Sequence, residues 1–224
     1  MHMTAPAMSK IRVLLADDHL IMRRGLRAII EHMGDYEVCG EAETGRAAVE
    51  LATRLRPEII VMDVSMPELN GLEAVRQIKK VMPEVEILMF TGHETEELVR
   101  QVFEAGARSY ILKTDGREPL EAALRSLAQH KPYFTTQIGE ILFAKFLHGK
   151  KGVEEESSTG RLTDREREIV QLLCEGASNK EVADKLGISV KTAETHRAAI
   201  MKKLQLKAFS DLVRYAIRNH IVEA

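Results

Sequence analysis

The first 130 residues alternate short apolar segments with longer amphipathic ones, and this alternation limits the possible folds more than any other feature. The apolar segments have the length of β-strands and lie at residues 11–16, 37–42, 58–62, 86–90 and 108–112. Helix patterns lie at residues 20–33, 45–55, 71–81, 95–105 and 117–130. Regular alternation of this kind predicts an α/β fold, a doubly wound parallel sheet of five strands.

The rest of the chain has a different character. Residues 131–160 are predicted to be a connector, with a short amphipathic helix near 135–147 followed by a flexible polar linker. Residues 161–224 show only helix patterns. Residues 1–9 are predicted to be disordered. We therefore expect two domains, one at residues 10–130 and one at 161–224.

The composition is that of a soluble globular protein, with 45% apolar and 29% charged residues in a chain of 224. No apolar run approaches the roughly 18 residues of a membrane helix, and no secretory leader is visible. We expect a cytoplasmic protein without a membrane partner, in which Cys39 and Cys174 remain reduced. Residues 1–130 hold 16 Lys and Arg against 21 Asp and Glu, whereas residues 161–224 hold 12 against 9. This asymmetry suggests that the two domains have different partners.

Three acidic residues follow strands of the predicted sheet. Asp17 and Asp18 follow the first strand, and Asp63 follows the third. Because the C-terminal ends of parallel strands line one crevice, these carboxylates should converge. They would repel one another unless a cation joined them, and Mg²⁺ is the hard, oxygen-binding dication that best suits the set. A single acid after a strand is often only a helix cap or a surface residue. The three acids together are therefore stronger evidence for a metal site than any one of them.

Two further strand ends supply complementary groups for phosphoryl transfer. Thr91 offers a hydroxyl and Lys113 an ammonium group. Asp63 can then attack a phosphoryl donor as a nucleophile. We expect Asp18 and Asp63 to hold Mg²⁺, with Asp17 acting through water. Lys113 would add a second positive charge, and Thr91 would bind a phosphate oxygen.

These strand ends resemble those of a response-regulator receiver domain. The matching residues are Asp17, Asp18, Asp63, Met66, Pro67, Gly71, Thr91, Tyr110 and Lys113. The resemblance implies that Asp63 takes phosphate from the phosphohistidine of a sensor histidine kinase. It also implies that the backbone carbonyl of Ser65 is a metal ligand and that Thr91 and Tyr110 rearrange to report phosphorylation. Tyr110 has an alternative role as an ordinary packing residue of its strand.

The chain departs from common receiver variants at Gly92, where alanine is frequent, and at Thr114, where some subfamilies have proline. Neither change removes a chemical group, so we expect the domain to be competent for phosphorylation. Ser65 and His93 flank the approach of water, which leaves the lifetime of the phosphate open.

Residues 161–224 contain signals for four helices. Capping boxes open the first two, at Thr163–Glu166 and Ser178–Glu181. Ser189 can cap a third helix, and a fourth follows at about 208–220. The second and third helices are joined by a short turn and have the proportions of a helix-turn-helix.

The third of these helices has two distinct faces. Apolar positions such as Ala193 and Ile200 fall on one side, and short or basic side chains fall on the other. A face with small side chains in its middle and lysines near its ends can enter the DNA major groove. With the start of the preceding helix, the predicted DNA-contacting residues are Ser178, Asn179, Lys180, Lys191, Thr192, Glu194, Thr195, Arg197 and Lys202. The alternative is an ordinary solvated helix surface, and Arg197 can instead brace the fold.

The same block resembles the LuxR-type helix-turn-helix over residues 161–208. The strongest matches are the segments Leu162–Glu168, Gly176–Ala183, Leu186–Ser189, Lys191–His196 and Lys202–Leu204. The resemblance implies double-stranded DNA as the partner and binding as a dimer, often through the last helix. An apolar stripe that includes Phe209 and Leu212 could serve as that dimer contact, although packing onto its own domain is an equal alternative.

Together the two resemblances indicate a NarL/FixJ-type response regulator, which catalyses only its own phosphoryl uptake and slow loss. Phosphorylation of Asp63 would favour a homodimer that binds a two-fold symmetric DNA site. One rival is a haloacid-dehalogenase-like phosphatase, although such enzymes usually place a second acid where this chain has Ser65. Another is a constitutive DNA-binding protein whose receiver serves only for dimerisation. The eight histidines are scattered, and we expect no metal or catalytic pairing among them.

Overall fold

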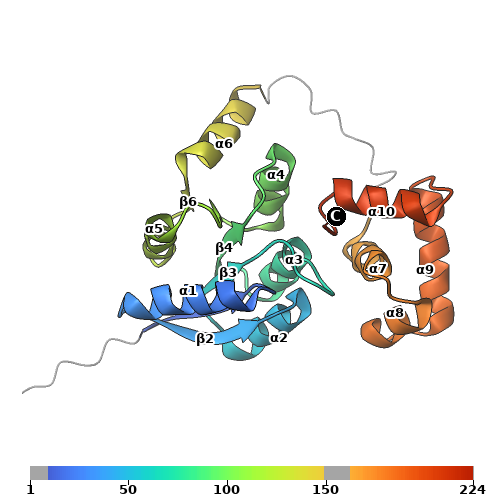
Figure 1. Cartoon of the computed structure of the whole chain (residues 1–224), viewed down its shortest axis with the longest axis horizontal. Helices are drawn as coiled ribbons and strands as arrows, with labels where there is room; N and C mark the ends of the chain where they lie inside the picture. Colours follow the sequence, from blue (N-terminus) through green and yellow to red (C-terminus); the bar gives the residue numbers. More distant parts are fainter. Residues whose placement is uncertain (1–9, 149–161, 224) are drawn as a thin grey trace, which may run out of the picture.

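The structure is a computed structural model that describes residues 10–148 and 162–223. Figure 1 shows two groups of elements side by side, an α/β group from the first part of the chain and a helical group from its end. The predicted disorder of residues 1–9 and the predicted linker at 149–160 lie outside the described residues.

The sheet of the α/β group is parallel throughout and has six strands. Their order across the sheet is β2-β1-β3-β4-β5-β6. The strands are β1 Ile11–Ala16, β2 Tyr36–Ala42, β3 Ile59–Met62, β4 Glu86–Thr91, β5 Ser109–Leu112 and β6 Tyr133–Phe134. The prediction of five strands was wrong because β6, which pairs with β5 at the sheet edge, has only two residues. A strand that short gives no periodic signal in the sequence.

Helices cover both faces of this sheet. They are α1 Leu20–His32, α2 Gly45–Leu55, α3 Gly71–Val81, α4 Glu96–Ala105, α5 Arg117–Leu127 and α6 Thr136–His148. Residues such as Leu26 and Leu120 bury α1 and α5 against one face. Residues such as Val75 and Val99 bury α3 and α4 against the other, where Ala48 of α2 and Ile138 of α6 join the same core. The predicted doubly wound architecture is confirmed.

Four helices form the second group, as predicted. They are α7 Asp164–Cys174, α8 Asn179–Leu186, α9 Val190–Lys203 and α10 Phe209–Arg218. Both predicted capping boxes are present, because Thr163 and Ser178 each accept a hydrogen bond from the N–H of a glutamate whose side chain accepts one in return. Ile169, Ile200 and Leu212 are fully buried in the core between these helices.

The two groups contact each other directly between α3 and α7. Lys80 Nζ lies 2.6 Å from Asp164 Oδ2, and Arg167 Nη1 lies 3.0 Å from Oε1 of the buried Glu73. Figure 1 shows the helical group beside α3 and α4. Ion pairs between α3 and α7 therefore help to hold the helical group against the α/β group.

Both cysteines are free and half-buried. Burial raises the pKa of the Cys174 thiol to about 11, so this thiol stays protonated near neutral pH. Among the helices of the described ranges, none combines the length and the apolar character that a bilayer crossing requires.

Candidate functional site

The strand register brings the predicted acidic residues together. Ala16 of β1 pairs with Met62 of β3, so Asp17 and Asp63, the next residues along each strand, leave the sheet side by side. One ligand atom from each of four residues lies within 4.8 Å of the others, and the four are Asp17, Asp18, His19 and Asp63. The structure thus unites the three predicted carboxylates and adds an imidazole that the sequence did not single out.

Lys113 lies against this cluster. Its Nζ donates a hydrogen bond to Asp63 Oδ2 at 2.7 Å and lies 2.8 Å from Asp17 Oδ2. Burial alone would lower the pKa of Lys113, but Asp63 and Asp17 together raise it, so its ammonium group stays charged. Burial raises the pKa of Asp63 to about 6, an effect that Lys113 opposes.

The backbone around Asp63 is fixed by the start of α3. The N–H of Gly71 donates to the carbonyl oxygen of Val64 at 2.8 Å. A Cβ atom on Gly71 would lie 1.9 Å from the carbonyl oxygen of Asp63, so only glycine permits this approach. Asn70 caps the helix by accepting a hydrogen bond from the N–H of Glu73 at 2.9 Å. These contacts hold the β3–α3 loop against the acidic cluster.

Asp17 is supported by a buried arginine that sequence reasoning missed. Arg23 of α1 is only 2% exposed, and its Nη1 donates to the backbone carbonyl of Asp17 at 2.6 Å. The same guanidinium pairs with Glu41 and Glu43. Arg23 lies among both polar and apolar residues of α1, and nothing in that local sequence indicates that its side chain supports Asp17.

A cavity of about 390 Å³ opens beside Asp63, and Ser65, Thr91 and Lys113 also line it. Thr91 is fully buried, and its Oγ1 accepts a long hydrogen bond of 3.4 Å from the N–H of His93. Tyr110 is fully buried in β5, and its hydroxyl donates to the carbonyl oxygen of His93. Tyr110 therefore packs in the core and also ties β5 to the segment that follows Thr91.

The donor set of the acidic cluster fits a hard dication. Asp17, Asp18 and Asp63 offer carboxylate oxygens, and Ser65 lies in the wall of the adjoining cavity. Oxygen ligands of this kind are those that Mg²⁺ prefers. The residues present are therefore compatible with the metal that the sequence predicts.

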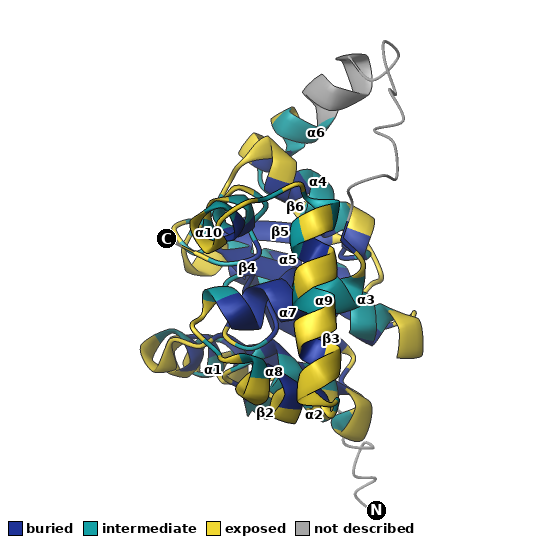
Figure 2. Ribbon diagram, turned by 90° about the vertical axis from the view of Figure 1, so that its right-hand side faces the viewer, coloured by how far each residue is buried: buried dark blue, intermediate teal, exposed yellow. Residues whose placement is uncertain are grey.

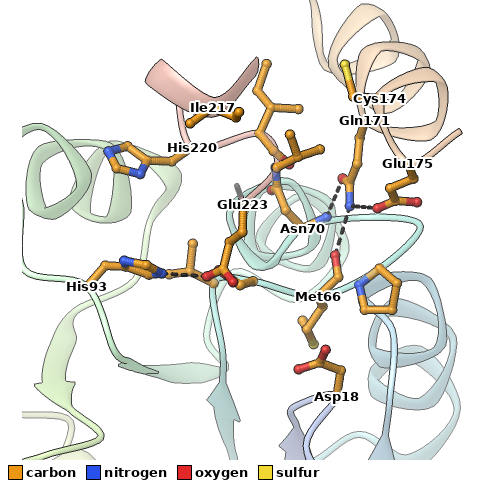
Figure 3. A pocket seen from close by; sticks show the side chains of 15 residues that line it. Asp18, Met66, Asn70, His93, Gln171, Cys174, Glu175, Ile217, His220 and Glu223 are labelled. Atoms are coloured by element: carbon orange, nitrogen blue, oxygen red, sulfur yellow. Dashed lines mark hydrogen bonds and ion pairs between the residues drawn. The ribbon is translucent and has the colours of Figure 1, made fainter. Parts of the chain in front are cut away.

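The helical group covers this edge of the sheet. In Figure 3 the side chain of Gln171 reaches the β3–α3 loop, where its Oε1 accepts from the N–H of Asn70 at 2.7 Å and its Nε2 donates to the carbonyl of Met66 at 2.8 Å. Beyond α10, Asn70 Nδ2 donates to the carbonyl of Ile221 at 3.3 Å. A cavity of about 610 Å³ lies between the two groups beside these contacts. None of the contacts was predicted, because isolated polar residues carry no local pattern.

Two histidines from distant parts of the chain also meet at this interface. The rings of His93 and His220 have centroids 6.4 Å apart, a contact between two residues that are 127 positions apart in the sequence. His220 Nε2 lies 3.2 Å from Thr95 Oγ1, and His93 Nε2 lies 2.5 Å from Glu223 Oε1. The segment between β4 and α4 is therefore bound to the tail that follows α10.

The predicted DNA-contacting face of α9 remains uncovered by the α/β group. Figure 2 shows an exposed strip along α9. The exposed residues of α9 are Val190, Lys191, Thr192, Glu194, Thr195, Ala198, Ala199 and Lys202, whereas Ala193 and Ile200 are buried. The predicted division of this helix into two faces is confirmed.

The remaining predicted DNA-contacting residues differ in their availability. Lys180 is exposed, Asn179 is half-buried, and the Ser178 hydroxyl accepts the capping hydrogen bond of α8. The Cζ of Arg197 lies 5.5 Å from the ring centroid of Phe209. This cation–π contact joins α9 to α10, as in the alternative in which Arg197 braces the fold.

Two protein-family models match the chain. A model described as the response regulator receiver domain matches residues 13–125. A model described as bacterial regulatory proteins of the luxR family matches residues 160–216.

Curated relatives match over nearly the whole length. The transcriptional regulatory protein LiaR of Bacillus subtilis is 38% identical, in an alignment that covers 95% of this chain and 99% of LiaR. The transcriptional regulatory protein MctR of Rhizobium johnstonii is 34% identical, over 95% of this chain and 96% of MctR.

Solved structures of a response regulator match most of the chain. The RcsB response regulator of Salmonella typhimurium matches with a TM-score of 0.58 and 27% identity, over 93% of this chain and 98% of that one. A structure of two RcsB dimers bound to two parallel DNAs matches with a TM-score of 0.58 and 25% identity, over 94% and 99% of the two chains.

Proposed function

Because this chain belongs to the response regulators that join a receiver domain to a LuxR-type DNA-binding domain, we propose that Asp63 is its phosphoacceptor. A sensor histidine kinase would supply the phosphoryl group. The phosphorylated protein would bind double-stranded DNA as a homodimer, which the RcsB dimers on DNA support. We also propose that the protein is cytoplasmic, where it could reach both DNA and the kinase.

The chain's own residues account for the transfer step. A carboxylate oxygen of Asp63 forms the new P–O bond while the P–N bond of the donor phosphohistidine breaks. The imidazole leaves with the electron pair of that bond and takes up a proton. Lys113, 2.7 Å from Asp63 Oδ2, offsets negative charge at the acceptor, and the Thr91 hydroxyl can donate to a phosphoryl oxygen.

The carboxylates of Asp17, Asp18 and Asp63 and the backbone carbonyl of Ser65 are the groups that would hold Mg²⁺. When bound, the ion neutralises charge on the phosphoryl oxygens. Arg23 contributes indirectly, because its hydrogen bond to the Asp17 carbonyl positions one of these carboxylates.

The observation that carries the proposal is the shared cavity beside Asp63. Thr91 and Lys113 come from different strand ends, yet both line this cavity, and the Asp17–Asp18 pair lies next to it. Thr91 and Tyr110 are the proposed reporters of phosphorylation, since both contact His93. Ser65, where a haloacid-dehalogenase-like phosphatase usually has a second acid, argues against that rival.

We propose that residues 10–130 form the receiver domain, 131–160 the connector and 161–224 the DNA-binding domain. The start of α8 and the exposed face of α9 would contact DNA. The exposed side chains proposed for phosphate and base contacts are Lys180, Lys191, Thr192, Glu194, Thr195 and Lys202, with Ser178 and Asn179 adding contacts at the start of α8.

The test compares wild type, Asp63→Asn and Asp35→Asn in the presence of acetyl phosphate and Mg²⁺. Asp35 is exposed and lies outside the acidic cluster, so its variant controls for the chemical change alone. We expect wild type and Asp35→Asn to gain one phosphoryl group by mass spectrometry and Asp63→Asn to gain none. Normal uptake by Asp63→Asn would refute the assignment, and steady turnover of a phosphorylated metabolite would favour the enzyme rival.

A further inference from the structure

The tail that follows α10, residues 219–223, reaches the cavity beside Asp63. Glu223 lines this cavity together with Asp63 and Lys113, and it also lines the larger cavity between the two groups. Figure 3 shows the Glu223 side chain pointing from the tail toward His93. A carboxylate from the DNA-binding part of the chain therefore lies at the entrance to the receiver site.

Glu223 contacts both residues that border the path to Asp63. Its Oε1 lies 2.5 Å from His93 Nε2. Partial burial acts to raise the pKa of Glu223, but its interactions with Ser65, His93 and Lys113 together lower that pKa. Ser65 lies two residues after Asp63, and His93 lies two residues after Thr91. One carboxylate thus bridges the two loops that flank the phosphorylation site.

The tail is anchored against the α/β group. Ile221 is only 4% exposed, and its carbonyl accepts the hydrogen bond from Asn70 Nδ2. His220 contacts Thr95 Oγ1 at 3.2 Å. The position of Glu223 is therefore tied to the docking of the whole helical group on the α/β group.

Charge makes this position sensitive to phosphorylation. In the unmodified protein the Lys113 ammonium lowers the pKa of Glu223, which means that it attracts the carboxylate. A phosphoryl group on Asp63 would add a charge of about −1.5 to −2 in the same cavity. Lys113 would then be neutralised by the phosphoryl oxygens, and Glu223 would be repelled.

We propose that Glu223 is a gate residue for the phosphorylation site. In the docked state it keeps phosphoryl donors from Asp63, and phosphorylation expels it together with the helical group. The inference rests on the proposed role of Asp63 and adds a regulator from the chain's own tail. The α9 face is exposed while the tail is docked. Glu223 therefore controls access to Asp63 and the separation of the domains, but the docked tail does not cover the DNA-contacting face.

The experiment measures the rate of phosphorylation by acetyl phosphate in full-length wild type, Glu223→Gln and Glu50→Gln. In this reaction an Asp63 oxygen bonds to phosphorus as acetate leaves with the electron pair of the broken P–O bond. Glutamine keeps the length and hydrogen-bonding capacity of Glu223 but removes its charge. Glu50 is exposed on α2 and lines neither cavity, so its variant is the matched control.

We expect Glu223→Gln to be phosphorylated roughly five-fold faster than wild type at low ionic strength, the size of one partly exposed charge interaction. Glu50→Gln should match wild type. The advantage of Glu223→Gln should shrink as salt is added, because screening weakens a charge effect but leaves a purely structural contact in place. Equal rates for Glu223→Gln and wild type at all salt concentrations would overturn the gate.

Small-angle scattering gives a second readout that does not depend on rates. We expect Glu223→Gln to have a larger radius of gyration than wild type before phosphorylation, and beryllofluoride to enlarge wild type. No expansion in either case would also overturn the gate. Asp63→Asn distinguishes a failure of the gate from a failure of the proposed acceptor. Phosphoryl uptake by Asp63→Asn would refute Asp63 as the acceptor. If Asp63→Asn takes up no phosphate and Glu223→Gln is phosphorylated at the wild-type rate, only the gate is refuted.

Discussion

The side-chain oxygen of Gln171 accepts a hydrogen bond from the backbone N–H of Asn70 at 2.7 Å, and both residues are buried. The same side chain donates to the carbonyl of Met66 at 2.8 Å. One side chain of α7 thus satisfies two backbone groups of the loop that follows Asp63. The helical group is held by the very loop that phosphorylation of Asp63 would disturb.

Replacing Gln171 with alanine should loosen this docking. Two buried backbone groups, the Asn70 N–H and the Met66 carbonyl, would lose their partners at a cost of about 1–3 kcal/mol each if they stayed buried. The domains are therefore expected to separate, which small-angle scattering would show as a larger radius of gyration. Gln129→Ala is the control, because Gln129 is exposed, follows α5 and accepts its side-chain hydrogen bond from Lys131 of the α/β group. A Gln171→Ala variant as compact as wild type would contradict this role.

Docking should also weaken in mild acid because of His220. Burial lowers the pKa of His220, the neighbouring His93 lowers it further, and Glu97 of α4 acts in the opposite direction. Since its pKa in the docked state lies below the free value of about 6.5, the proton binds better when the domains separate. The contribution of neutral His220 to docking is therefore fully present above the free pKa of about 6.5. It is lost as the pH falls from there through the lowered pKa of the docked state.

The measurement is the radius of gyration between pH 7.5 and 5.5. Wild type should expand toward the acid end, and His220→Gln should expand less because it cannot be protonated. His32→Gln, at an exposed position of α1, should behave like wild type. The same pH profile in all three proteins would show that His220 is not the responsible group.

The α/β fold and the acidic cluster could be predicted because both arise from simple regularities. Apolar strands such as Ile59–Met62 are buried on both faces of a parallel sheet, so they stand out as continuous apolar runs. Once the strands are parallel and in register, Asp17 and Asp63 must leave the same edge together. The faces of α9 followed from the helical period in the same way.

The contacts between the two groups could not be predicted from the sequence. Gln171, Asn70 and Glu223 are polar residues whose partners lie a hundred or more residues away in the chain. Nothing in their local sequence distinguishes them from solvated residues. Asn70 directly precedes the helix predicted at residues 71–81, and its hydrogen bond to Ile221 depends on how the two groups pack against each other.

Gly71 should be far less tolerant of substitution than Gly25. In Gly71→Ala the new Cβ would lie 1.9 Å from the Asp63 carbonyl oxygen, so α3 or the loop must shift. We expect a loss of about 3 kcal/mol of unfolding free energy or more, together with slower phosphorylation. In Gly25→Ala the new Cβ meets nothing within 4 Å, and a glycine inside α1 is replaced by a better helix former. That variant should gain about 0.5–1 kcal/mol. Urea denaturation of both variants provides the measurement, and similar effects from the two would contradict the steric argument.

Lys202 offers a test of the DNA-contacting face that separates charge from sequence recognition. It is exposed near the end of α9, where the proposed docking on DNA would place it at a phosphate. Lys202→Ala should weaken binding to all DNA sequences alike and reduce the slope of log K against log salt by about one.

Lys131→Ala removes an exposed lysine from the α/β group and should leave that slope unchanged. Fluorescence anisotropy with one specific and one scrambled duplex, each over a salt series, makes the comparison. An unchanged slope in Lys202→Ala would remove Lys202 from the proposed DNA contacts. A loss confined to the specific duplex would instead mean that Lys202 reads base edges, because a phosphate contact carries no sequence information.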